Sequence, residues 1–154
     1  MNTKVTGAGV LCFVNNTDGR ISDLPKDIVY LVLATFNNKF DFPKGTKDYK
    51  ESDYSCAFRE TYEECNLSIS NFKDKDYGSI NLNGNLVMYI REIKDSAYLN
   101  KEIIKIKPTK GIEEHKYFTF KNYDNCKGKM LKFLEIYLDK AHTMLNNLPG
   151  NDII

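Results

Sequence analysis

The chain lacks a long apolar run and lacks a strong charge of either sign. No stretch reaches the roughly 18 apolar residues of a membrane span, and the opening segment MNTKVTGAGVLCF has neither the basic start nor the apolar core of a secretion signal. The 22 basic and 21 acidic side chains leave a formal net charge of +1, so no overall field attracts nucleic acid or an anionic membrane. We expect a soluble intracellular protein of the cytoplasm, with no membrane partner and no DNA partner.

Paired cysteine motifs are also missing from the sequence. The cysteines are far apart and form neither a CxxC pair nor a CxxC/HxxxH arrangement, being Cys12, Cys56, Cys65 and Cys126. These spacings are not typical of zinc or dithiol redox sites. We expect buried, reduced thiols.

The chain does have enough apolar residues for one core. It has 154 residues, of which 42% are hydrophobic, and this is the size of one globular domain. We predict a single domain over residues 1–148 and a C-terminal tail over residues 149–154.

Runs of β-branched and aromatic residues predict a sheet. The runs at residues 7–14 and 28–36 are almost continuously apolar, which indicates strands covered on both faces. Turn residues between these runs predict a long exposed loop. A short extended piece and two further strands are predicted at residues 40–43, 86–91 and 116–120, with a lysine-rich connection at residues 101–111.

Helical periodicity predicts a helix over residues 53–65 and another over residues 129–145. Ser52 is the expected N-cap of the first helix, and Asn66 tolerates the left-handed conformation that often ends one. Its predicted apolar stripe consists of Phe58, Thr61, Tyr62 and Cys65. Strands between helices make an α/β class with a mixed sheet.

Three glutamates of the first helix share one predicted face. Glu60, Glu63 and Glu64 stand at i, i+3 and i+4, so we expect them to project together, opposite the apolar stripe. Such like charges repel unless cations are present, and hard oxygen ligands suit Mg²⁺ or Mn²⁺. For a bare triad of this kind a solvated helix face is the better interpretation. Arg59 is placed to pair with one of these carboxylates, and the carbonyl of a tight turn at Gly45 could add a neutral oxygen.

The wider spacing favours the metal interpretation because it resembles the Nudix box, G-x5-E-x7-R-E-U-x-E-E-x-G-U, in which U is a bulky aliphatic residue. The matching positions are Gly45, Glu51, Arg59, Glu60, Glu63 and Glu64. At about 7% per identity, six chance matches have a probability on the order of one in ten million at a given start. Thr61 and Asn66 depart from the pattern, but neither departure touches a carboxylate.

The resemblance implies an α/β/α sandwich and hydrolysis of a phosphoanhydride bond in a nucleoside-diphosphate-linked substrate. The expected cofactor is Mg²⁺ or Mn²⁺, with Gly45, Glu60, Glu63 and Glu64 as the metal-ligating residues. Water would attack one phosphorus in line with the broken bond, while the metal lowers the pKa of that water. Glu63, Glu64 and Arg59 are therefore expected to be catalytic, and Glu51 to support them.

The general base is left open by the resemblance, which draws it from the box or from a glutamate on a later loop. Glu113 and Glu114 are the later candidates, and a charged loop before a strand is an equally good interpretation of them. We expect Glu114 to be catalytic because the Glu114-His115 pair resembles the Glu-His of dinucleoside tetraphosphate hydrolases.

The local wording of the box is similar to the mRNA-decapping branch. Its segments are Phe42-Pro43-Lys44-Gly45, Glu51-Ser52-Asp53, Cys56-Ala57 and Tyr62-Glu63-Glu64. We expect the 5′ cap of mRNA as substrate, then dinucleoside polyphosphates, then diphosphoinositol polyphosphates, with a catalytically silent Nudix binding module as a further alternative. The partner is then a nucleotide-type small molecule or the 5′ end of capped RNA.

Residues for holding such a substrate can also be predicted. Lys44 lies beside the box and could hold phosphates, and Phe40 or Tyr89 could stack on a base. Tyr77, Lys47 and Lys50 are weaker candidates.

Overall fold

A computed structural model describes residues 4–82, 84–100 and 115–148 of the chain. Within these residues, none of the helices is both long enough and apolar enough to cross a membrane.

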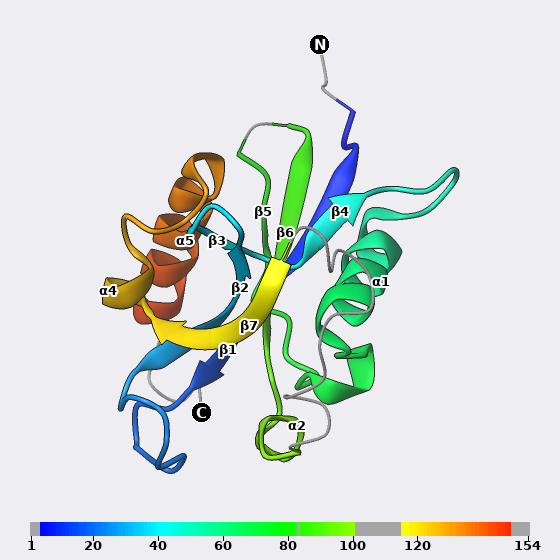
Figure 1. Cartoon of the computed structure of the whole chain (residues 1–154). Helices are drawn as coiled ribbons and strands as arrows, with labels where there is room; N and C mark the ends of the chain where they lie inside the picture. Colours follow the sequence, from blue (N-terminus) through cyan, green and yellow to red (C-terminus); the bar gives the residue numbers. More distant parts are fainter. Residues whose placement is uncertain (1–3, 83, 101–114, 149–154) are drawn as a thin grey trace.

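The described strands form one mixed sheet (Figure 1). The strands are β1 (Gly7–Asn15), β2 (Ile28–Thr35), β3 (Phe40–Asp41), β4 (Lys44–Thr46), β5 (Ser79–Ile80), β6 (Leu86–Glu92) and β7 (His115–Asn122). Their main path is β3-β2-β1-β6-β5, while β4 pairs with β1 and β7 pairs with β2. The β1–β6 pair is parallel and the other strand pairs are antiparallel. The predicted mixed sheet is confirmed.

Helices cover both faces of this sheet. Helix α1 (Asp53–Cys65) lies on one face and helix α5 (Lys132–Asn146) lies on the other, as Figure 1 shows. The short helices α2 (Asp95–Tyr98) and α4 (Tyr123–Cys126), together with the 3-10 turn η1 (Ile69–Asn71), complete the described elements. The molecule is therefore an α/β/α sandwich, as expected.

The central strands β1 and β2 separate two apolar clusters. Along β1, Val10 and Cys12 belong to the cluster under α1, whereas Leu11 and Phe13 belong to the cluster under α5. Alternate side chains point to opposite faces of a strand, so a strand covered on both faces needs apolar residues at every position. This explains the continuous apolar runs of the sequence.

The connection between β1 and β2 is better anchored than a free exposed loop. Asn16 is fully buried, and its side-chain amide donates to the carbonyls of Ile21 at 3.0 Å and Pro25 at 2.9 Å. Its Oδ1 accepts from the backbone N–H of Ile21 at 2.9 Å. Most residues of this connection are exposed, as predicted, and the buried amide of Asn16 anchors its backbone.

Helix α1 has the predicted ends. The Ser52 hydroxyl accepts a hydrogen bond from the Ser55 N–H at 3.1 Å, and Asn66 adopts φ of 61°. The predicted apolar stripe is wrong at Tyr62, which is 53% exposed. The predicted Phe58, Thr61 and Cys65 are buried, and the buried face also includes Ala57 and Glu64.

Helix α5 starts later than predicted, at Lys132. Gly128 adopts φ of 82°, and Met130 forms an isolated bridge with Phe40, so the segment before the helix is extended. Phe133 was predicted on the apolar stripe but is 49% exposed. The prediction for the cysteines is confirmed, since all four are free and buried.

Candidate functional site

Arg59 is the centre of the acidic face of α1. Its Nε and Nη2 donate to the two carboxylate oxygens of Glu51 at 2.7 and 2.9 Å, which is the predicted bidentate geometry, although the partner is Glu51. Its Nη1 donates to Glu63 at 2.7 Å and to Glu60 at 3.3 Å. The hydrogen bonds from Arg59 hold the pKa of Glu51 at about 2. One guanidinium therefore compensates three of the four box carboxylates.

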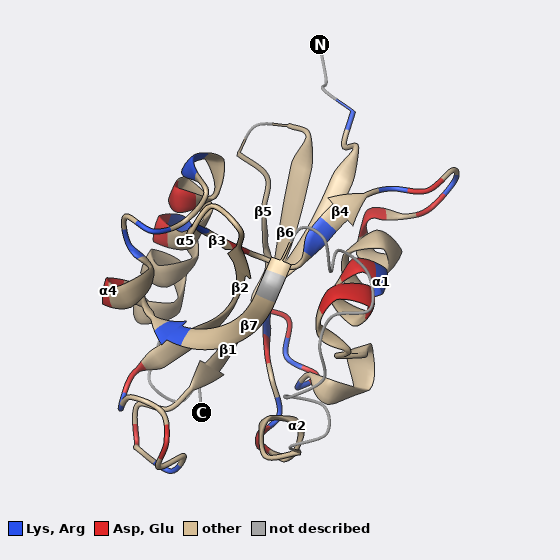
Figure 2. Cartoon of the chain, in the orientation of Figure 1, with Lys and Arg blue, Asp and Glu red and all other residues tan. Residues whose placement is uncertain are grey.

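Arg59 reduces the charge repulsion between the glutamates of α1. The sequence suggests that clustered glutamates require a bound cation, but Arg59 supplies a positive charge from within the helix. Figure 2 shows the acidic segments of α1 and the basic segment of β4 that they face. The acidic face is thus not the plain solvated one of a surface helix, and part of it is buried.

Gly45 lies in strand β4 and not in a tight turn. It pairs with Ala8 of β1, so the expected glycine turn is wrong. Glycine is needed here because of a close contact and not because of a turn. A Cβ built on Gly45 would lie 2.1 Å from the carboxylate carbon of Glu60. The carboxylate of Glu60, which is 3% exposed, packs against the bare backbone of β4.

The carbonyl of Gly45 faces the helix. It accepts a long hydrogen bond from the Cys56 thiol at 3.5 Å. This backbone oxygen therefore lies at the contact between β4 and α1, as a metal-ligating role for Gly45 would require.

Glu64 is the most buried carboxylate of the face after Glu60, at 4% exposure. Its Oε1 accepts a hydrogen bond from the backbone N–H of Lys44 at 3.2 Å. Burial raises the pKa of Glu64 to about 8; the hydrogen bond from the Lys44 N–H lowers this pKa, and the nearby carboxylates of Asp41 and Glu60 raise it. Glu64 can therefore exist in either protonation state near neutral pH.

A buried polar pair lies next to these glutamates. His115 Nε2 is 2.9 Å from Asp41 Oδ2, with both side chains almost fully buried. The other Asp41 oxygen is 3.3 Å from Lys44 Nζ, and within the described residues His115 Nδ1 has no hydrogen-bond partner. This pair ties the first residue of β7 to β3 and, through Lys44, to the acidic face.

Asp41 was missed by the sequence analysis. The signal was present, because Phe40-Asp41-Phe42 alternates apolar, polar and apolar residues in a short extended segment. Alternation directs Asp41 away from the side of Phe40 and Phe42, and both phenylalanines pack with the cluster under α5. A lone aspartate in a four-residue stretch is too weak a pattern to identify a partner such as His115.

The aromatic residues that were predicted to stack on a base, Phe40 and Tyr89, do not lie close together. Phe40 packs with the cluster under α5, whereas Tyr89 packs with the cluster under α1, where its ring meets that of Tyr54 edge-to-face at 5.5 Å. Tyr77 packs edge-to-face on Phe13 and donates to Glu92 at 3.2 Å. Phe40 and Tyr89 therefore lie on opposite faces of the sheet.

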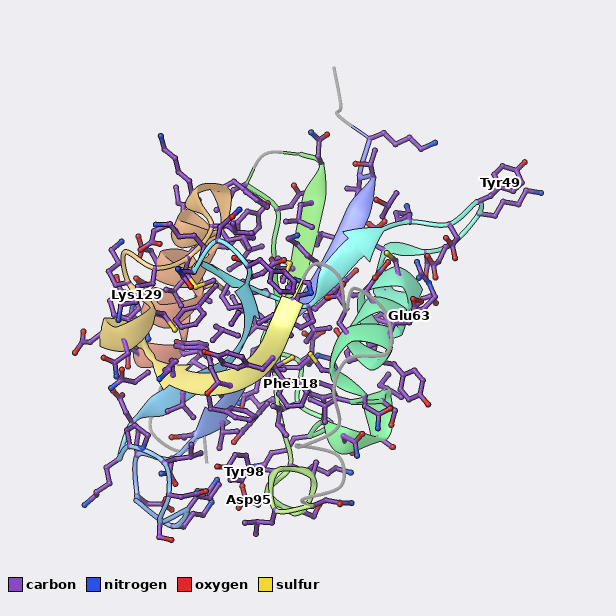
Figure 3. All side chains as sticks on the ribbon, viewed as in Figure 1. Tyr49, Glu63, Asp95, Tyr98, Phe118 and Lys129 are labelled. Atoms are coloured by element: carbon purple, nitrogen blue, oxygen red, sulfur yellow. The ribbon has the colours of Figure 1, made fainter. Side chains whose placement is uncertain are left out.

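The basic residues after Gly45 lie on the loop between β4 and α1. Lys47 pairs with Asp53 at 2.7 Å, and Lys50 lies over the ring of Tyr49 at 5.4 Å. Figure 3 shows Tyr49 at the tip of this loop, far from Glu63. Glu113, Glu114 and the connection at residues 101–111 lie outside the described residues.

The donor set of the acidic face has the right chemistry for Mg²⁺ or Mn²⁺, since carboxylate and carbonyl oxygens are the ligands these ions prefer. In the part of the chain that the structure describes, no group of three or more His, Cys, Asp or Glu side chains is arranged to hold a metal ion. Arg59 instead gathers Glu51, Glu60 and Glu63 around its own guanidinium. A metal ion would have to take at least Glu63 from this arginine.

Comparisons by sequence give no relative. No family model matches the chain, and no curated protein matches it.

Comparison by structure gives a consistent fold. The chain is similar to an Ap4A hydrolase of C. elegans in a binary complex (TM-score 0.64, 17% identity), with 94% of this chain and 99% of that chain covered. It is similar to the Nudix hydrolase RenU of M. smegmatis (TM-score 0.64, 11% identity), with 95% and 88% covered. A NUDIX hydrolase of Nitrosomonas europaea gives a TM-score of 0.60 at 14% identity, with 98% and 96% covered. The chain has the fold of these hydrolases over almost its whole length, which confirms the fold expected from the box.

Proposed function

We propose that this chain is a metal-dependent Nudix hydrolase that breaks a phosphoanhydride bond in a nucleoside-diphosphate-linked substrate. The observation that supports this proposal best is the contact of Glu60 with the bare backbone of Gly45, beside the buried Glu64. The first residue of the box and its helical part are thus in contact within a fold shared with hydrolases of this class. An ordinary solvated helix face needs neither the glycine nor the buried carboxylates.

Glu60, Glu63, Glu64 and the Gly45 carbonyl would hold the Mg²⁺ or Mn²⁺. When bound, such a cation lowers the pKa of the attacking water and neutralises charge on the bridging oxygen. Glu63 would exchange its Arg59 contact for the ion, while Arg59 keeps its two hydrogen bonds to Glu51.

The residues of this chain supply positioning and proton transfer. Arg59 fixes Glu51 and so fixes the start of α1 relative to β4, since it also donates to the Thr46 carbonyl at 3.1 Å. A glutamate of the box is one candidate for the general base. Glu114 and Glu113 stay as alternative bases.

The substrate we favour is the 5′ cap of mRNA. This proposal is supported by the local sequence of the box, in particular by Glu51-Ser52-Asp53 and Cys56-Ala57. In the structure Ser52 caps α1, and Cys56 is a buried residue of that helix, so these positions argue for kinship and not for contact with the substrate.

The second candidate is a dinucleoside polyphosphate. It is favoured by the structural similarity to the C. elegans Ap4A hydrolase, and by the Glu114-His115 pair that resembles such enzymes. A cap is itself two nucleosides joined through a polyphosphate, so the two candidates share their chemistry. Diphosphoinositol polyphosphates and a silent binding module are the remaining alternatives.

One assay separates these substrates. The protein is incubated with Mg²⁺ or Mn²⁺ and with capped RNA, diadenosine tetraphosphate, nucleoside diphosphate sugars or diphosphoinositol phosphate, and the products are identified. Release of 7-methyl-GDP is the expected result and selects decapping, whereas ATP plus AMP selects the second candidate. Absence of turnover on the whole panel would contradict the proposed enzyme and favour the binding module.

A further inference from the structure

We propose that Phe133 and Lys44 form a binding subsite for a nucleobase at the open end of the cleft beside Gly45. This inference rests on the proposed function, because it places one nucleoside of the substrate relative to the acidic face. Neither the box nor the comparisons assign a role to Phe133.

The first observation is a pocket that touches the acidic face. It has a volume of about 280 Å³ and is lined by the ends of β1, β4 and β6 together with α5, through Thr6, Gly7, Lys44, Gly45, Thr46, Asn85, Leu86 and Phe133. Gly45 lines this pocket and also lies against the carboxylate of Glu60 on the acidic face. Strand β4 at Gly45 therefore borders both the pocket and the carboxylate of Glu60.

The second observation is the exposure of an aromatic ring in that pocket. Phe133 lies in the first turn of α5 and is 49% exposed, whereas the residues that follow it on the helix, such as Leu134 and Tyr137, are buried. The ring is not needed to fill the core under α5. An exposed ring in a recess offers a flat apolar surface on which a base can stack.

The third observation is a cation beside the ring. Lys44 Nζ lies 5.3 Å from the centroid of Phe133, and it is 3.3 Å from Asp41 Oδ1. Lys44 therefore lies between the aromatic surface and the acidic cluster, where the phosphates of a bound nucleotide would pass. An ammonium group there can pair with phosphate while the base rests on the ring.

The size of the pocket limits the ligand. Small-molecule sites have volumes of about 300–1,000 Å³, and a pocket of about 280 Å³ lies just below this range, which favours one nucleoside over two. The subsite would thus take a single base, and the second half of a dinucleotide substrate would lie on the other side of the cleaved bond.

The chain offers a direct probe of this subsite because it contains no tryptophan. In Phe133→Trp the new side chain is the only indole, so its fluorescence reports on the pocket alone. We expect 7-methyl-GDP or ADP to quench this emission in a saturable manner, whereas ribose 5-phosphate and pyrophosphate leave it unchanged. The nucleotide that quenches at the lower concentration indicates whether the subsite prefers the base of a cap or adenine.

A matched control is available on the same helix. Ile136 is also exposed, at 57%, but it does not line this pocket. Ile136→Trp should keep its emission in the presence of every compound. Equal quenching of both variants, or quenching of Phe133→Trp by ribose 5-phosphate, would overturn the subsite.

Turnover gives a second readout on whichever substrate the panel identifies. Phe133→Leu keeps the apolar bulk but removes the flat ring, so KM should rise about tenfold or more with little change in kcat, as loss of one stacked base predicts. Phe133→Tyr should restore the KM. An unchanged KM in Phe133→Leu contradicts the inference.

The two proposals fail in different ways. If no substrate of the panel is hydrolysed but nucleotides still quench Phe133→Trp, the subsite stands and the proposed hydrolysis is wrong. If hydrolysis occurs and nucleotides leave the emission of Phe133→Trp unchanged, the proposed function stands and the subsite is wrong.

Discussion

At the scale of single residues, Gly45 and Glu60 define the site more closely than charge does. A Cβ on Gly45 would overlap the carboxylate of Glu60, so the two residues are a matched pair. The contact between Gly45 and Glu60 cannot be predicted from either residue alone, since it depends on how α1 lies on β4. The spacing of the box predicted that these residues belong together, but not that they touch.

The Gly45–Glu60 contact predicts a specific effect of Gly45→Ala. The new methyl group must push Glu60 aside, so we expect kcat/KM to fall about tenfold or more while the free energy of unfolding falls by only about 1–2 kcal/mol. The measurements are turnover and urea unfolding. In a Glu60→Ala background the same change should cost almost no stability, because the clash is gone.

Glu63→Gln tests the acidic face directly. Glutamine keeps the size of the side chain but loses the negative charge, so we expect kcat to fall at least about a hundredfold, with an unchanged circular dichroism spectrum. Asp124→Asn is a suitable control, because Asp124 is an exposed acid of α4, outside the site. Normal turnover in Glu63→Gln would remove this residue from the mechanism.

The raised pKa of Glu64 predicts how stability depends on pH. The folded protein keeps the proton of Glu64 up to about pH 8, whereas the unfolded chain loses it near the ordinary value of about 4.3. The folded state therefore binds more protons between these values, and this group makes stability fall as pH rises, by at most about 1.4 kcal/mol per pH unit.

The check is urea unfolding in a chelator at several values between pH 5 and pH 8.5. Wild type should lose stability relative to Glu64→Gln across this range, because glutamine does not titrate. Parallel curves for the two proteins would contradict the raised pKa.

At the scale of elements, helix α1 was predictable and helix α5 was predictable only in part. Ser52 and Asn66 fix the ends of α1 locally, through a side-chain cap and a left-handed residue, and local signals can be found in a sequence. The start of α5 depends on the bridge between Met130 and Phe40, which are far apart in the chain. The exposure of Tyr62 and Phe133 likewise depends on how each helix rotates against the sheet.

The cap of α1 gives a prediction for the whole helix. Ser52→Ala removes the acceptor for the Ser55 N–H, so the free energy of unfolding should fall by about 1 kcal/mol. Ser55→Ala is the control, because Ser55 is an exposed residue inside the helix and alanine is a better helix former. In urea unfolding, Ser52→Ala should therefore lower the free energy of unfolding, whereas Ser55→Ala should not.

At the scale of the molecule, the site combines segments that are distant in the sequence. Strand β3 supplies Asp41, helix α1 supplies Glu60 and Glu64, and strand β7 begins at His115. The box identified the part that lies within one continuous segment. The Asp41–His115 pair joins residues that are 74 positions apart, and no local pattern can indicate such a pairing.

This long-range pair should be important for stability. Asp41→Ala leaves His115 Nε2 without its buried acceptor and removes the carboxylate beside Lys44, so we expect a loss of about 3 kcal/mol in the free energy of unfolding. Asp41→Asn keeps an acceptor oxygen and should lose less. A loss below about 1 kcal/mol in Asp41→Ala would mean that the pair is not a structural link.

The position of Arg59 also bears on whether the proposed metal ion is needed for folding. In many small domains built around a structural metal site, the ion is a condition of folding, and chelation unfolds the chain. Here an arginine of the same helix takes the place of the ion between the glutamates. Because this counter-charge belongs to the helix itself, we expect the chain to fold without a bound cation.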